Sequence, residues 1–172
     1  GHRSCYFNQA FRVNKGHYGT VMLEGLKFWF AGDKGDAKTV ELTFEPSATR
    51  EQRAAIRAFM SHFLPLKWTS FTEGPDARID WKAEAVRAEA RLDGGKAAAV
   101  LLTRNPGATT EGTTVIQNMS YFGSTRNEGF NIMPVELIAY RRGPKPSPFE
   151  FRGTSGWTIT IDMSSRDVVA AR

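Results

Sequence analysis

One strongly amphipathic helix stands alone in a sequence that otherwise alternates between apolar and polar residues. Thr49 and Gln52 have the spacing of a capping box, and Pro65 supplies a stop signal. Between these signals, apolar residues recur at helical spacing and form one face: Ile56, Phe59, Met60, Phe63 and Leu64. We therefore predict one main helix over residues 49–64.

Short runs of alternating apolar and polar residues lie on both sides of this helix, separated by glycine-rich turns. Such alternation is typical of strands with one buried face. The clearest runs are Cys5–Val13, Val21–Phe30, Val40–Phe44, Ala97–Leu102 and Pro134–Tyr140. The sequence predicts an α+β, β-rich single domain over residues 1–172, with about eight strands in an antiparallel curled sheet or sandwich and the helix packed on one face. Residues 1–4 and 163–172 are expected to fray.

Residues 77–92 fit two interpretations. Their alanine, glutamate, lysine and arginine content favours a helix. Against this, apolar and charged residues alternate from Ile79 to Leu92, and Asp93-Gly94-Gly95 then leads into the next apolar run as a hairpin turn would. We predict strands here and keep the helix as the alternative.

Charge and cysteine content argue against several classes of function for this chain. The chain carries 23 Lys and Arg against 18 Asp and Glu, so its net charge is +5, and the two signs are interleaved. The one basic cluster, Arg141–Lys145, lies in a proline-rich loop without a reading element, so we expect no nucleic-acid partner. No apolar run is long enough to span a membrane. Cys5 is the only cysteine, which excludes an intrachain disulfide and a cysteine metal cage.

The sequence starts at Gly1 without a methionine. Removal of a signal peptide would explain this start, and so would trimming at a domain boundary. We expect export, and hence a secreted or periplasmic location.

The N-terminal third of the chain resembles an uncharacterised bacterial family, the one catalogued as domain of unknown function 1326. The resemblance lies in residues 5–30 and 44–64. Its motifs are Gly16-His17-Tyr18-Gly19, Leu23-Glu24-Gly25-Leu26 and Ser47-Ala48-Thr49-Arg50-Glu51-Gln52. The resemblance implies a single-domain fold and brings no catalytic residues. Family members often carry a cysteine-rich segment near their start, whereas this chain has only Cys5, so no metal or redox role is carried over.

No catalytic or metal-binding signature stands out. The chain has three histidines, too scattered for a typical zinc site, and it lacks the common glycine-rich phosphate loops. We therefore expect no metal, no cofactor and no catalytic residues. The alternative is a hydrolase-like enzyme that uses His17, Cys5 or a carboxylate in a cleft.

Aromatic residues are the remaining functional signal. Large aromatic side chains turned toward a cleft hold apolar or planar ligands, while a few polar groups fix the pose. The candidate ligand-binding residues are His17, Tyr18, Trp29, Trp68, Trp81 and Tyr121. The alternative interpretation is that these aromatic residues fill a two-layer core.

The sequence thus favours a non-enzymatic, exported domain that binds a small apolar ligand or a protein partner. The hydrolase is the first alternative. The second is a structural protein that self-associates, for example as a homodimer, through exposed strand edges.

Overall fold

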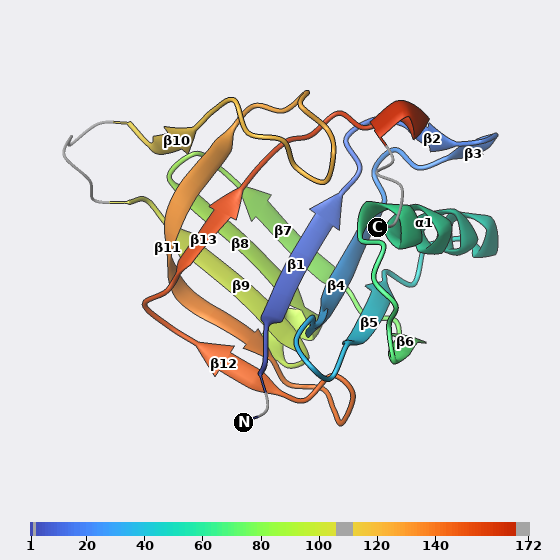
Figure 1. Cartoon of the computed structure of the whole chain (residues 1–172), viewed down its shortest axis with the longest axis horizontal. Helices are drawn as coiled ribbons and strands as arrows, with labels where there is room; N and C mark the ends of the chain where they lie inside the picture. Colours follow the sequence, from blue (N-terminus) through green and yellow to red (C-terminus); the bar gives the residue numbers. More distant parts are fainter. Residues whose placement is uncertain (2, 106–111, 168–172) are drawn as a thin grey trace.

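The computed structural model describes residues 1, 3–105 and 112–167 (Figure 1). Its one α-helix is α1, Arg50–Phe63. A first sheet has the order β1–β4–β5–β6, with bounds Tyr6–Arg12, Lys27–Asp33, Thr39–Phe44 and Ser70–Glu73. A short hairpin outside both main sheets is formed by β2 (His17–Tyr18) and β3 (Val21–Met22).

A second, larger sheet has the order β10–β11–β9–β8–β7, and β12 and β13 also pair with β11. The bounds of β7 to β9 are Ile79–Ala83, Arg87–Leu92 and Ala98–Thr103. Those of β10 to β13 are Thr114–Ile116, Phe130–Tyr140, Phe149–Phe151 and Ser155–Thr158. The predicted α+β, β-rich class with one main helix is confirmed. The described part of the chain holds thirteen strands, four of them only two or three residues long.

The signals at the helix ends act as predicted. The Gln52 backbone N–H donates to the Thr49 hydroxyl at 3.2 Å, and the Thr49 N–H donates to the Gln52 side chain at 3.0 Å. At the other end, the Leu64 N–H donates to the Met60 carbonyl just before Pro65. Local signals therefore define both ends of α1.

The stretch with two interpretations forms strands β7 and β8, as predicted. Ile79 pairs with Leu92 in the antiparallel ladder, and both side chains are fully buried. Burial of one face outweighs the helix propensity of the alanine and glutamate residues between them.

The first sheet lies between α1 and the second sheet, because both of its faces are apolar. On one face, Phe28 and Phe30 pack in a cluster with Ile56 and Met60 of α1. The opposite face carries Trp29, which belongs to a second cluster between the two sheets. Its buried members include Trp29, Ala31, Ile79, Leu92, Ala98, Tyr140 and Phe149. Figure 1 shows α1 on one side of β4 and β5 and the larger sheet on the other.

A buried asparagine joins the two sheets. Asn8 on β1 donates through Nδ2 to the carbonyls of Ala99 (3.2 Å) and Ala139 (2.8 Å), which lie opposite each other in the β9–β11 ladder. Its Oδ1 accepts from the Trp29 indole N–H at 2.5 Å. Asn8 is 8% exposed, so these bonds form away from water and fix the registry of the two sheets.

Of the ends expected to fray, residues 2 and 168–172 lie outside the described residues. The Arg3 N–H donates to the Asp36 carboxylate, and Ser165–Asp167 forms a short 3₁₀ turn. Among the described helices, none has the length and apolarity needed to cross a membrane.

Replacing Asn8 with alanine should lower the free energy of unfolding by about 2–3 kcal/mol, because it leaves the Trp29 N–H and two carbonyls without this partner in the interior. Denaturant unfolding followed by tryptophan fluorescence measures the change. Asn14→Ala, in an exposed turn, is the matched control and should shift stability by less than about 0.5 kcal/mol. Equal effects of the two substitutions would contradict the role given to Asn8.

Candidate functional site

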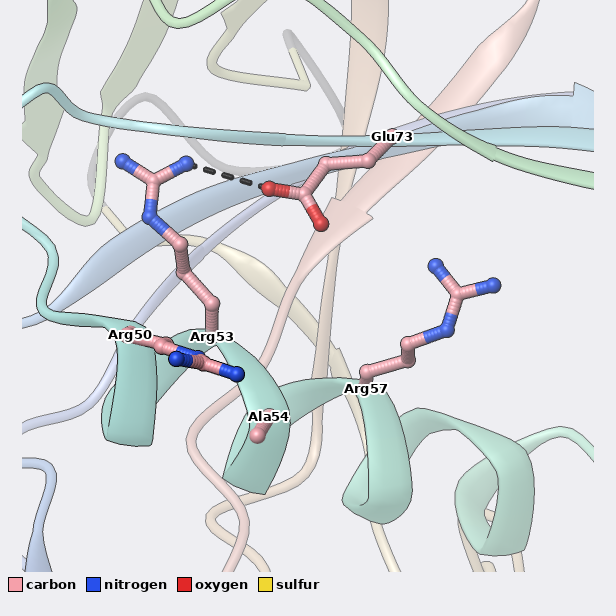
Figure 2. A pocket seen from close by; sticks show the side chains of 5 residues that line it. All are labelled: Arg50, Arg53, Ala54, Arg57 and Glu73. Carbon is pink, nitrogen blue, oxygen red and sulfur yellow. Dashed lines mark hydrogen bonds and ion pairs between the residues drawn. The ribbon is translucent and has the colours of Figure 1, made fainter.

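An open hollow of about 420 Å³ lies between α1 and β6 (Figure 2). Its lining residues are Arg50, Arg53, Ala54, Arg57 and Glu73. All but Glu73 belong to α1, and the spacing of the three arginines places them along one side of the helix. The small side chain of Ala54 leaves the space between them. We call this hollow the arginine groove.

Arg53 ties the helix to the strand and the loop beyond it. Its guanidinium donates to both oxygens of Asp76 (2.6 and 2.7 Å) and to Glu73 (3.1 Å). It also lies over the Phe44 ring, 5.2 Å from the centroid. The hydrogen bonds from Arg53 lower the pKa of the Asp76 carboxyl, and they raise the pKa of Arg53 itself. Arg53 is therefore a structural member of the groove.

Arg50 and Arg57 differ from Arg53, because neither forms an ion pair with a carboxylate in the described part of the chain. Both are exposed. Arg57 lies 4.5 Å above the Phe71 ring and makes a long hydrogen bond, 3.4 Å, to the Phe71 carbonyl. Figure 2 shows its guanidinium turned away from the Arg53–Glu73 pair. The groove thus presents two guanidinium groups that are open to an anionic ligand.

The strand wall of the groove is anchored at its far end. The Gly74 N–H, just after β6, donates to the Leu42 carbonyl of β5. A Cβ at Gly74 would collide with the Glu41 carboxylate and with Arg142. These two side chains form a mostly buried ion pair at 3.0 Å. A side chain at this position would have to displace the Glu41–Arg142 pair, so glycine here lets β6 lie close to β5 without that shift.

Of the three tryptophans predicted as ligand-binding residues, Trp29 lies in a core, whereas Trp68 and Trp81 are partly buried and pack against the two cores. Trp29 is 1% exposed and bonds to Asn8 between the sheets. Trp68 packs on Phe7 and Phe30, beside the cluster between α1 and the first sheet. Trp81 packs against the cluster between the two sheets, and the Arg12 guanidinium lies 5.8 Å from the centroid of its ring. The indole N–H groups of Trp68 and Trp81 are buried without a hydrogen-bond partner.

The other three predicted residues also lie outside the arginine groove. His17 and Tyr18 are exposed on the β2–β3 hairpin, and the His17 ring bonds to the Gly19 carbonyl at 2.8 Å. Tyr121 accepts a hydrogen bond from Gln9 (3.1 Å) and packs edge-on against Phe63. Burial raises the pKa of the Tyr121 hydroxyl. The structure therefore does not bring the six residues together around one cavity.

The residues of the hydrolase alternative are also apart. Cys5 precedes β1 and His17 follows it, and a seven-residue strand spans roughly 20 Å. The Cys5 N–H donates to the buried Asp33 carboxylate at 2.6 Å, which occupies that acid with a backbone contact.

The basic cluster noted in the sequence is mostly neutralised within the chain. Arg141 pairs with Glu150, and Arg142 pairs with Glu41. Two of the three basic side chains of this loop are therefore already paired, whereas neither Arg50 nor Arg57 on α1 pairs with a carboxylate in the described part of the chain.

Sequence reasoning did not single out the three helix arginines and missed the groove. Their spacing was visible in the sequence, but the strand that faces them was not, because β6 joins the sheet through long-range pairing. The site can be recognised only when the arginine spacing on α1 is considered together with the edge strand β6 beside it.

Comparison of the chain with known protein families, with curated proteins and with solved structures gives no match. Membership of the family catalogued as domain of unknown function 1326 therefore stays a prediction.

Arg53→Ala should lower the free energy of unfolding by about 2 kcal/mol, because it removes a two-pronged contact with Asp76 and the cation–π contact with Phe44. Arg57→Ala should cost about 0.5–1 kcal/mol, since Arg57 is exposed, forms no ion pair with a carboxylate among the described residues, and contacts only the Phe71 ring and carbonyl there. Denaturant unfolding of the two variants measures both values. A larger loss for Arg57→Ala would contradict this division of roles.

Proposed function

We propose that this chain is a non-enzymatic binding domain whose arginine groove takes an acidic segment of a protein partner. One observation carries the proposal: Arg50 and Arg57 flank an open hollow without ion-pair partners among the described residues, beside the outermost strand of the first sheet. Guanidinium groups bind carboxylates through two parallel hydrogen bonds, which gives both attraction and orientation.

A contact inside the molecule supports this choice of ligand. The Glu73 carboxylate reaches from β6 to Arg53 across one end of the groove (Figure 2). A carboxylate on a chain lying beside β6 would meet Arg57 or Arg50 from a similar side. The net charge of +5 would also favour approach of an acidic partner.

The protein partner is the better supported of the two expected ligand classes. A small apolar ligand needs an apolar cavity, but the space between α1 and the first sheet is filled by Phe28, Phe30, Phe44 and Phe63, each at most 2% exposed. Export from the cytoplasm stays a prediction, which fractionation of the native cells would test.

The test uses a fluorescein-labelled peptide of five glutamate–threonine repeats as the probe. At about 20 mM NaCl its fluorescence anisotropy should rise on addition of the protein, and about 0.5 M NaCl should abolish the rise. The double variant Arg50→Ala/Arg57→Ala should weaken binding about tenfold, since each exposed charge contact contributes about 0.5–1 kcal/mol. Glu73→Gln should tighten binding, because it removes a like charge from the groove.

The matched control is Lys15→Ala/Lys96→Ala, which removes two positive charges elsewhere on the surface. Its affinity should stay within about twofold of the unmodified protein. The proposal is wrong if the probe does not bind at low salt, or if both double variants lose affinity equally.

A further inference from the structure

Strand β6 has one unpaired edge within the described structure. It pairs with β5 on one side only, as the outermost strand of the first sheet. The Gly74 backbone N–H donates to the Leu42 carbonyl of β5, and the Ser70 N–H donates at 3.4 Å to the carbonyl of Lys38, just before β5. In a parallel ladder alternate residues bond to the same neighbour, so Thr72 also faces β5, whereas Phe71 and Glu73 turn their N–H and C=O groups outward. This edge offers two N–H donors and two carbonyl acceptors, of which the Phe71 carbonyl already accepts a long bond of 3.4 Å from Arg57.

The free edge of β6 and the arginines of α1 border the same groove. The side chains of Phe71 and Glu73 both face α1, where they meet Arg57 and Arg53. Because paired strands keep their side chains on common faces, an added strand would place every second side chain under the same helix face.

We propose that the acidic segment binds as an extra strand on the free edge of β6, with acidic residues at alternate positions directed at Arg50 and Arg57. This inference rests on the proposed function and names its mode of recognition, which is β-strand addition. Backbone hydrogen bonds hold the segment, and the alternating carboxylates select it.

The free edge of β6 has features that disfavour pairing with an unselected chain. The strand is four residues long and is followed by Pro75, which limits pairing with an arbitrary chain. Arg57 covers the Phe71 carbonyl with a bond of 3.4 Å. A partner carboxylate gives this guanidinium a stronger acceptor, and the carbonyl is then released to the incoming strand.

Two N-methylated forms of the probe test strand addition. One carries methyl groups on the glutamate nitrogens and the other on the threonine nitrogens, so charge and composition are the same. In an added strand, the residues of one type turn their N–H groups toward β6 and those of the other turn them to solvent. One peptide should therefore lose affinity about tenfold or more, and the other should bind within about threefold of the parent.

Each result has a defined meaning. Loss in the glutamate-methylated peptide alone supports an antiparallel added strand, and loss in the threonine-methylated peptide alone supports a parallel one. Equal affinity of both methylated peptides and the parent overturns strand addition but leaves the proposed charge recognition intact. Equal loss in both methylated peptides overturns strand addition as well. Failure of the parent peptide to bind overturns the proposed function itself.

A second copy of this chain could also pair with the free edge of β6, and sedimentation velocity of the protein alone tests this. We expect a monomer that the peptide leaves monomeric. A dimer that the peptide dissociates would overturn the proposal, because the edge of β6 would then belong to a homodimer interface.

Discussion

Burial of both faces of β4 is the constraint on which the rest of the structure depends. Phe28 and Phe30 need cover on one side of this strand, and Trp29 and Ala31 need cover on the other. A sheet with two apolar faces is stable only between two layers, so α1 takes one face and the second sheet takes the other. Asn8 then fixes the position of the second sheet on the first, because its hydrogen bonds form in only one registry of the two sheets.

The groove follows from this layering and from chain connectivity. The chain leaves β5, crosses the sheet as α1 and returns as β6, which therefore lies parallel to β5 at the margin of the sheet. The second sheet covers the other face and does not extend this margin. One long side of α1 is left facing a short strand edge, and its arginines, rather than apolar residues, occupy that side. Arg53 ties α1 to the loop after β6, whereas Arg50 and Arg57 have no carboxylate partner among the described residues.

Local signals made much of the fold predictable. The capping box at Thr49 and the stop at Pro65 define α1 without reference to the rest of the chain, and alternation predicted β7 and β8 against their helix propensity. Long-range pairing was not predictable in the same way. The run Val21–Phe30 was expected to form one strand, yet Gly25 adopts a left-handed φ of 79° and the run divides between β3 and β4. Trp29 lies on the opposite face from Phe28 and Phe30, as alternation along a strand requires, but the surface it faces is the second sheet, which no local pattern reveals.

Amide hydrogen exchange of β6, resolved by NMR, tests most directly whether this strand edge is open. We expect an alternation in the free protein, with slow exchange at Thr72 and Gly74, which bond to β5, and fast exchange at Phe71 and Glu73, which face solvent. Slow exchange at all four amides would mean that another element or a second chain already occupies the edge, and strand addition at β6 would then be wrong.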